Sequence, residues 1–224
     1  MTSATANRRP LKSRDTGWAR SVSAWLARLG VSPDAVSAGS LVCALIGCAA
    51  FVTAGSADGA LRVSFLFAAA VSIQCRLICN LLDGMIAVEH GRGSPFGPIW
   101  NELPDRIADA LFLVGAGYGA ARAGLGWASD LGWAAAVLAV LTAYVRELGR
   151  GLGQPADFSG PAAKPHRMAL LTLAAVISAI AEPNLWRPGW SMAIGLAVIC
   201  FLVAVTLVRR TLRLAARLAA NSGQ

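Results

Sequence analysis

The chain has 224 residues, of which 56% are hydrophobic and 14% are charged, and its mean hydropathy is +0.57. These values exclude an ordinary soluble domain, in which about a quarter of the residues are charged, and they indicate an integral membrane protein. The formal net charge of +8 does not predict a nucleic-acid partner. The basic residues lie in short loops between apolar segments, where the orientation of membrane helices explains them.

The segment before the first long apolar stretch predicts a helix that lies on the membrane surface. Trp18, Trp25 and Leu29 recur at helical spacing among basic residues, a pattern typical of interfacial amphipathic helices. A solvated basic tail is the alternative, and the two tryptophans argue against it. The preceding RRPLKSR would attract anionic lipids, and we expect no cleavable signal peptide. Ser32 and Pro33 suit the N-cap and first position of the next helix.

Six apolar segments follow, most of them near the ~20 residues that a bilayer crossing requires. They are approximately residues 35–54, 61–88, 101–121, 131–149, 168–181 and 192–208. The fifth segment is short unless it begins near Lys164. We therefore predict an all-α integral membrane fold of six transmembrane helices with an N-terminal amphipathic interfacial helix. The five cysteines all lie in apolar segments without metal-type spacing, so we interpret them as packing residues.

The basic residues predict the orientation of these helices. Six crossings place both termini on one side, and most Lys and Arg residues fall on that side, with Arg62, Arg122 and Arg187 opposite. The positive-inside rule makes the terminal side cytoplasmic. We expect an integral protein of a bacterial inner membrane with both termini in the cytoplasm. Its expected parts are a cytoplasmic segment with the interfacial helix (residues 1–33), a six-helix domain (34–210) and a basic C-terminal tail (211–224).

Acidic residues are concentrated where the second apolar segment leads into the third. Of the twelve acids in the chain, five lie between residues 80 and 109. These are Asp83, Glu89, Glu102, Asp105 and Asp109. An ionised group at membrane depth costs at least about 2.5–3.5 kcal/mol, so the cluster is a candidate functional site. It needs a partner of opposite charge, and a divalent cation is the obvious one.

The spacing of these residues places them on two facing helices. Asn80 and Asp83 are three apart and project from one helix face, whereas Asn101, Asp105 and Asp109 recur every four residues along a second helix. The intervening GRGSPFGP is too rich in Gly and Pro for a helix and predicts a turn. The two oxygen-bearing stripes would then meet at the cytoplasmic end of the helices.

This pattern resembles the signature of the CDP-alcohol phosphatidyltransferase family. That signature runs Asp, two residues, Asp-Gly, two residues, Ala-Arg, eight residues, Gly, three residues, Asp, three residues, Asp. On this chain its positions fall on Asn80, Asp83, Gly84, Ala87, Val88, Gly97, Asn101 and Asp105. The spacing agrees throughout, and five of the eight residues agree. The departures are two asparagines in place of aspartates and Val88 in place of arginine.

The resemblance implies an activity and roles for these residues. The family transfers a phosphatidyl group from CDP-diacylglycerol to an alcohol and releases CMP, with two divalent ions, Mg²⁺ or Mn²⁺, clamping the diphosphate. Asp105 would be a metal ligand and the catalytic base. The metal-ligand candidates are Asn80, Asp83, Asn101, Asp105 and Asp109.

The substrate-binding candidates also follow from the resemblance. Gly84 and Ala87 would leave room for the cytidine, and Gly97 precedes the second helix. In the family, basic residues at comparable helix ends hold the acceptor phosphate, which makes Arg146, Lys164 and Arg167 candidates here. A homodimer and contacts with membrane lipids are implied as well.

Simpler interpretations remain open for individual residues. Asn101 could be the N-cap of its helix, and Asp109 could form a buried ion pair with Arg76 or Arg106. Asn80 could form a hydrogen bond between helices. The second basic group, Arg146 with its neighbours, could be positive-inside anchoring, with Glu147 as an ion-pair partner.

Two other functions compete with the transferase. A catalytically silent relative that binds lipid or nucleotide is the main alternative, because two asparagines remove two negative charges from the expected metal site. A transporter is less favoured, because the acids lie near one membrane face and transporter sites lie near the midplane.

Overall fold

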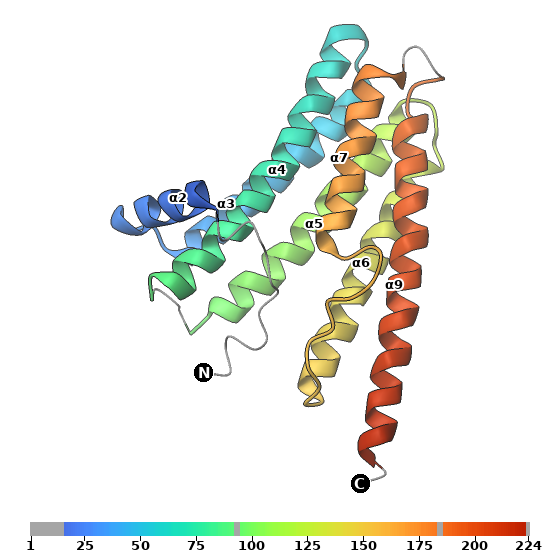
Figure 1. Ribbon diagram of the computed structural model, residues 1–224. Helices are drawn as coiled ribbons and strands as arrows, with labels where there is room; N and C mark the ends of the chain where they lie inside the picture. The colour runs from blue at the N-terminus through green and yellow to red at the C-terminus, as the bar shows by residue number, and fades with distance from the viewer. Residues whose placement is uncertain (1–15, 92–94, 183–185, 223–224) are drawn as a thin grey trace.

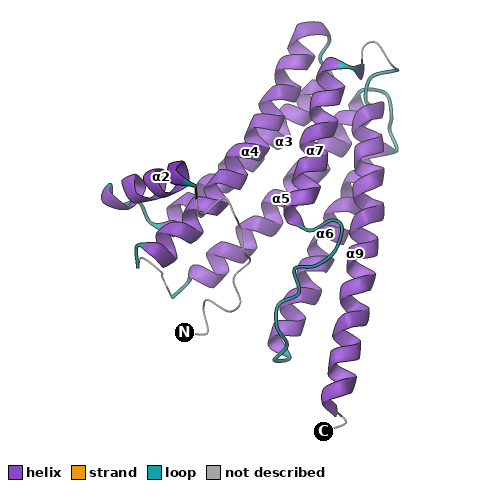
Figure 2. Cartoon of the chain, viewed as in Figure 1, coloured by secondary structure: helices purple, strands orange, loops and turns teal. Residues whose placement is uncertain are grey.

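The computed structural model describes residues 16–91, 95–182 and 186–222, and over these residues every regular element is a helix (Figures 1 and 2). The RRPLKSR run and part of the GRGSPFGP turn lie outside the described residues. The helices are α2 (Gly17–Arg28), α3 (Pro33–Ala54), α4 (Gly59–Glu89), α5 (Gly97–Arg122), α6 (Ala128–Gly151), α7 (Lys164–Ile180) and α9 (Trp190–Ser222). The prediction of an all-α fold is therefore confirmed for this part of the chain.

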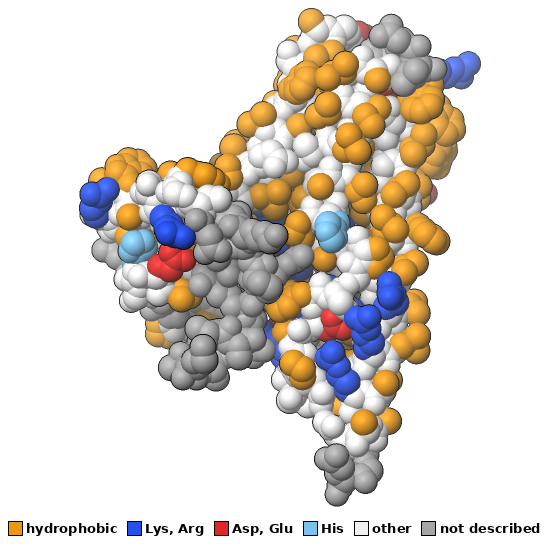
Figure 3. Space-filling view, viewed as in Figure 1, with side chains coloured by type: hydrophobic (Ala, Val, Ile, Leu, Met, Phe, Trp, Pro, Cys, Tyr) orange, Lys and Arg blue, Asp and Glu red, His pale blue; other side chains and the backbone are white. Residues whose placement is uncertain are grey.

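Four helices, α3, α4, α6 and α9, are long and apolar enough to cross a membrane. Helix α7 has 17 residues and spans about 26 Å at 1.5 Å per residue, slightly less than the ~30 Å hydrocarbon core. Helix α5 has 26 residues but carries Glu102, Asp105, Arg106 and Asp109 along its first half. The outer faces of the bundle expose large apolar side chains (Figure 3), including Leu45, Leu173 and Phe201. These features fit an integral membrane protein.

Helix boundaries agree with the sequence-based expectations at some positions and not at others. Ser32 caps α3, since its Oγ accepts a hydrogen bond of 3.1 Å from the N–H of Ala35, and Pro33 is the first helical residue. Helix α7 begins at Lys164. This is the start that the fifth apolar segment requires if it is to approach the length of a bilayer crossing. The N-cap interpretation of Asn101 is wrong, because α5 begins at Gly97 and Asn101 lies in its second turn.

The six long helices form a closed circuit of neighbours. Helix α3 packs along both α4 and α5, α5 packs on α6, α6 on α9, α9 on α7, and α7 returns to α4. The short helix α2 lies outside this circuit against α4, with Trp18 and Trp25 about half exposed. Helix α9 has 33 residues and is about 50 Å long, so its C-terminal part extends past the other helices (Figure 1).

Glycines set how closely α5 approaches its neighbours. A Cβ on Gly119 would lie 2.4 Å from the carbonyl oxygen of Phe51 on α3, and a Cβ on Gly117 would lie 2.8 Å from both the Ala128 oxygen and Gly132 Cα. Such small residues let membrane helices approach closely enough for backbone-to-backbone packing. The fixed distance between α3, α5 and α6 holds the acidic half of α5 in place.

We predict that Gly117→Ala destabilises the protein, because the obstructing atoms are backbone atoms that cannot rotate away. Overpacking of this kind costs about 1–3 kcal/mol of the free energy of unfolding. Gly39→Ala is the matched control, because a Cβ there meets nothing within 4 Å. Melting temperatures of the purified variants in detergent measure both effects. Equal melting temperatures for the two variants would contradict the packing described here.

Candidate active site

The α4 side of the site is built around Asp83, whose side chain is buried. One carboxylate oxygen accepts a 2.6 Å hydrogen bond from Ser37 Oγ on α3, and the other accepts a 2.5 Å hydrogen bond from the N–H of Gly84. Among the described residues, no Lys, Arg or His side chain forms an ion pair with Asp83. A buried carboxylate held only by neutral donors is costly without a cation. Asp83 is therefore the part of the site that lacks a counter-charge.

The α5 side is different, because its acids are fully paired with basic groups. Asp105 forms ion pairs with Lys164 at the start of α7, with Arg76 Nη2 at 3.2 Å and with Arg106 Nη2 at 3.6 Å. Asp109 accepts hydrogen bonds of 2.7 Å from both Arg76 Nη2 and Arg167 Nη2. The network therefore connects α4, α5 and α7. The expected pairing of Asp109 with Arg76 is present, whereas Arg167 is its second partner in place of Arg106.

The two asparagines have a different environment from the acids. Asn80 is half-buried on α4, one turn before Asp83, and Asn101 is exposed on α5, one turn before Asp105. Neither side-chain amide forms a hydrogen bond with another residue that the structure describes. Their oxygens remain available to a ligand or a metal. Among the described residues, no three His, Cys, Asp or Glu side chains are grouped closely enough to hold a metal ion, so any cation site here depends on these amides or on substrate oxygens.

The remaining predicted substrate residues lie beside this network. Gly84 and Ala87 follow Asp83 on α4, and Gly97 begins α5; all three are partly exposed. Lys164 and Arg167 contact the acids of α5, whereas Arg146 forms ion pairs with Glu102 at 2.5 Å and Glu147 at 2.8 Å. The expected pairing of Glu147 with this basic group is confirmed. The three basic candidates thus surround the acidic helix on two sides instead of forming one separate cluster.

The long connection from α6 to α7 contacts Arg146 of α6 and is hydrogen-bonded to α9. Arg210 donates to the carbonyl oxygens of Ser159 and Thr142 at 2.9 and 3.0 Å, and the Arg146 guanidinium lies 5.4 Å from the centre of the Phe158 ring. The pKa of the Asp157 carboxyl lies below its ordinary value: burial would raise it, but hydrogen bonds from Ser159 and the charge of Arg210 outweigh the burial. The C-terminal part of α9 therefore holds the α6–α7 connection in place.

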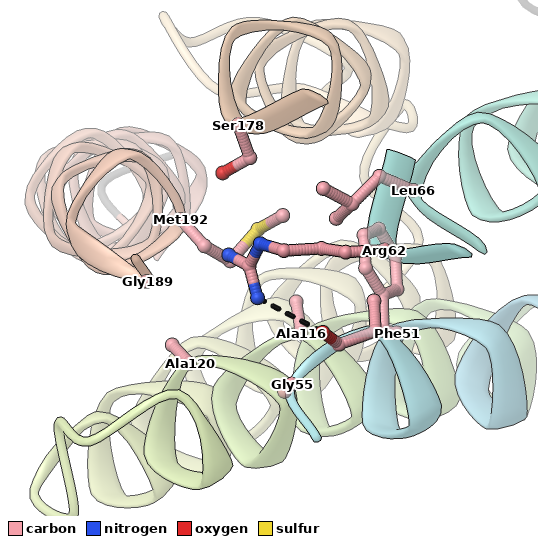
Figure 4. A pocket seen from close by; sticks show the side chains of 11 residues that line it. Phe51, Gly55, Arg62, Leu66, Ala116, Ala120, Ser178, Gly189 and Met192 are labelled. Carbon is pink, nitrogen blue, oxygen red and sulfur yellow. Dashed lines mark hydrogen bonds between the residues drawn. The ribbon is translucent and has the colours of Figure 1, made fainter. Parts of the chain in front are cut away.

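A pocket at the opposite end of the bundle has a different lining, mostly apolar side chains and glycines around Arg62 (Figure 4). Arg62 donates to the carbonyl oxygen of Ala54 at 2.9 Å and to Glu182 Oε2 at 2.8 Å, and Glu182 Oε1 accepts from the N–H of Ser191. These bonds join the ends of α3, α4 and α9 through a paired, buried carboxylate. We interpret this pocket as a structural junction.

Two residues of the site, Arg76 and Ser37, differ in how easily they can be identified from the sequence. Arg76 is recognisable as a charge within an apolar segment, four residues before Asn80. Ser37 carries no such signal, because it is one of several serines in a short apolar stretch and its role depends on how α3 packs against α4. Its hydrogen bond to Asp83 is visible only in three dimensions.

Comparison with known proteins identifies relatives of the chain. No family model matches the chain. It is 27% identical over 194 residues to the phosphatidylinositol phosphate synthase of Mycolicibacterium smegmatis, covering 82% of this chain and 77% of that protein. The corresponding enzyme of Mycobacteroides abscessus is 28% identical over 166 residues, covering 68% and 66%. The homologues are phosphatidylinositol phosphate synthases, enzymes of the CDP-alcohol phosphatidyltransferase type.

Solved structures show the same fold. Mycobacterium tuberculosis phosphatidylinositol phosphate synthase with CDP-DAG bound superposes with a TM-score of 0.71 at 20% identity, covering 88% of this chain and 92% of that one. The same enzyme in complex with manganese and citrate gives a TM-score of 0.69 at 19% identity, covering 88% of both chains. The circuit of six long helices is therefore an arrangement that experiment has shown for an enzyme of this type.

We predict that Arg167→Met strongly destabilises the protein, because it leaves the buried Asp109 with one partner fewer. Breaking a buried ion pair in this way costs about 3–5 kcal/mol. Arg150→Met is the control, since its side chain is 43% exposed and surface substitutions usually change stability by no more than about 0.5 kcal/mol. Thermal unfolding in detergent separates the two variants. Similar losses for both would show that the network does not stabilise the fold.

Proposed function

We propose that this chain transfers a phosphatidyl group from CDP-diacylglycerol to an alcohol and releases CMP. The observation that carries the proposal is a buried carboxylate on each of two helices, Asp83 on α4 and the ion-paired Asp105 on α5, in a chain similar over most of its length to phosphatidylinositol phosphate synthases. A solved enzyme of the same fold has CDP-DAG bound. Two carboxylate-bearing helices that present oxygen ligands suit a reaction at a diphosphate.

The cofactor in this proposal is Mg²⁺ or Mn²⁺, and the residues present fit such an ion. Among the described residues, Asp83 is a buried carboxylate without a basic partner. The other candidate ligands, Asn80, Asn101 and Asp105, offer the hard oxygens that these ions prefer. Asp83 and Asp105 would hold the cation, with Asn80 and Asn101 as further oxygen donors and Asp109 behind them. The bound ion would neutralise charge on the diphosphate and make CMP a better leaving group. The manganese complex of a solved relative supports this choice of metal.

The chain's own residues perform the remaining steps. Asp105 would accept the proton of the acceptor hydroxyl as it attacks the phosphorus of CDP-diacylglycerol, and Arg76 and Lys164 orient its carboxylate. Gly84 and Ala87 have side chains small enough to leave room for the cytidine between α4 and α5. The leaving CMP departs as the new phosphodiester bond forms.

The acceptor in this proposal is a phosphorylated alcohol such as inositol phosphate. The curated relatives are named phosphatidylinositol phosphate synthases, and three basic residues, Arg146, Lys164 and Arg167, lie at the same end of the bundle as Asp105. Their guanidinium and ammonium groups can bind a phosphate by charge-assisted hydrogen bonds.

The membrane arrangement completes the proposal. Helices α5 and α7 cross the membrane together with the four more apolar helices α3, α4, α6 and α9, and α2 lies in the interface. The positive-inside rule places the site and both termini on the cytoplasmic side of a bacterial inner membrane, where a water-soluble acceptor is available. A homodimer in contact with membrane lipids is also proposed, and for the homodimer the support is family resemblance alone.

The proposal predicts metal-dependent CMP release from CDP-diacylglycerol by the purified protein in liposomes, with inositol phosphate, glycerol phosphate, inositol and serine tested as acceptors. Asp105→Asn removes the base and should lower the rate by about 10²–10⁴-fold. Asp58→Asn, at the far end of α4, is the matched control and should leave the rate unchanged.

Release of CMP can be followed by mass spectrometry. If folded protein released no CMP with any acceptor, the chain would instead be a silent relative that binds lipid or nucleotide. Release that is equal in the Asp105→Asn variant would contradict the assignment of the base.

A further inference from the structure

Arg76 is the most deeply buried charged group in the candidate site, with 0% of its surface exposed. It lies on the same face of α4 as Asn80 and Asp83, one and two turns further from the cytoplasmic end. Its Nη2 donates to the carbonyl oxygen of Asp105 at 3.0 Å, to Asp105 Oδ1 and to Asp109 Oδ1. A single guanidinium therefore holds two acidic side chains of α5 from the opposite helix.

The guanidinium also retains unused donors. Within the described part of the chain, Arg76 Nε and Nη1 and Arg167 Nε are buried and have no hydrogen-bond acceptor. Buried donors without acceptors are rare in folded proteins, and each one calls for an explanation. A ligand rich in acceptor oxygens, such as a diphosphate, would satisfy them.

The charges of the site argue against two divalent cations. Asp83, Asp105 and Asp109 contribute three negative charges. The basic residues within reach of Asp105 and Asp109 contribute four positive charges, giving a sum of +1. These are Arg76, Arg106, Lys164 and Arg167. Glu102, which also pairs with Arg106, is balanced by its second partner Arg146, so the sum is unchanged. The positions at which two further carboxylates would compensate a second ion hold the neutral amides Asn80 and Asn101. One divalent cation held by Asp83 together with Asp105 is electrostatically reasonable. A second one at Asp105 and Asp109, where Arg76 already supplies the positive charge, is not.

We propose that Arg76 replaces a second divalent cation as the permanent counter-charge of Asp105 and Asp109, so that the chain binds one metal ion. This inference rests on the proposed function and specifies the metal content of its site. Arg76 is a positioning residue: it fixes the two carboxylates of α5 and offers its free donors to the substrate diphosphate. Neutral amides at positions 80 and 101 suit a site that contains Arg76, because carboxylates there would have no second ion to bind.

The test is the number of Mn²⁺ ions bound per chain, measured on purified protein in detergent by metal analysis and by electron paramagnetic resonance. The wild-type protein should bind one ion and show the spectrum of an isolated Mn²⁺. The triple variant Asn80→Asp, Asn101→Asp and Arg76→Gln should bind two ions with a spectrum of exchange-coupled Mn²⁺. Asn80→Asp and Asn101→Asp combined with Arg76→Lys is the matched control and should still bind one ion.

Arg76→Gln alone should bind the single ion about tenfold more tightly, which corresponds to about 1.4 kcal/mol, because one positive charge is removed from beside it. A merely structural arginine would not change this affinity, whereas it would change the melting temperature. Size-exclusion chromatography and melting temperature establish that each variant is folded. If the variants do not fold, the wild-type protein still decides the question by its own stoichiometry.

Two Mn²⁺ ions on the wild-type protein, or none, would overturn this inference, as would a single ion on the folded triple variant. Two ions together with CMP release would leave the proposed function intact. One ion without CMP release would support the inference about the metal site and contradict the proposed transferase activity.

Discussion

The structure depends on how three buried carboxylates are compensated in a region of low dielectric constant. Asp109 has two guanidinium partners at 2.7 Å, and Asp105 has three basic partners, so the α5 side of the site carries its own cations. Within the described part of the chain, Asp83 accepts hydrogen bonds from Ser37 and Gly84 and has no basic partner. Removing one partner would leave a buried carboxylate with less compensation, which costs more than the loss of an exposed ion pair. This asymmetry defines where an external cation can bind.

The helix packing serves this arrangement. Helix α3 lies along both α4 and α5, and the glycines of α5 bring it close to α3 and α6. Helices α4 and α5 are thus held by a shared neighbour, and Arg76 joins them across their facing sides. At the other end of the bundle, the Arg62–Glu182 ion pair links the ends of the helices. The site therefore lies on rigid helices, which is what catalytic positioning requires.

Much of the fold follows from the sequence because membrane helices are encoded locally. The six apolar segments correspond to α3, α4, α5, α6, α7 and α9, with small shifts at their ends except that α9 continues to Ser222. Ser32 and Pro33 mark the start of α3 as expected. Helix α5 begins four residues before the apolar segment that predicts it, since Gly97 and Pro98 can occupy a first helical turn. Residues 211–222 continue α9 as helix, so no helix ends at residue 210. The division of the chain into a membrane domain and a C-terminal tail at this residue stays a prediction.

The partners within the site were less predictable, because they depend on contacts between distant segments. Lys164 and Arg167 were expected at an acceptor phosphate, and the structure places them against Asp105 and Asp109. Both roles are compatible if an incoming phosphate exchanges with the carboxylates. The spacing of Asn80, Asp83, Asn101 and Asp105 predicted the two facing helices. It could not show that, of the three buried acids, Asp83 is the one without a basic partner among the described residues.

The central claim is that the uncompensated Asp83 recruits a divalent cation for the diphosphate of CDP-diacylglycerol. The most direct test is the affinity of the purified protein for CDP-diacylglycerol in detergent, measured by calorimetry with Mg²⁺ and with a chelator. We predict that chelation and the Asp83→Asn substitution each weaken binding by about tenfold or more, equivalent to about 1.4 kcal/mol. The same affinity in all three conditions would contradict the account.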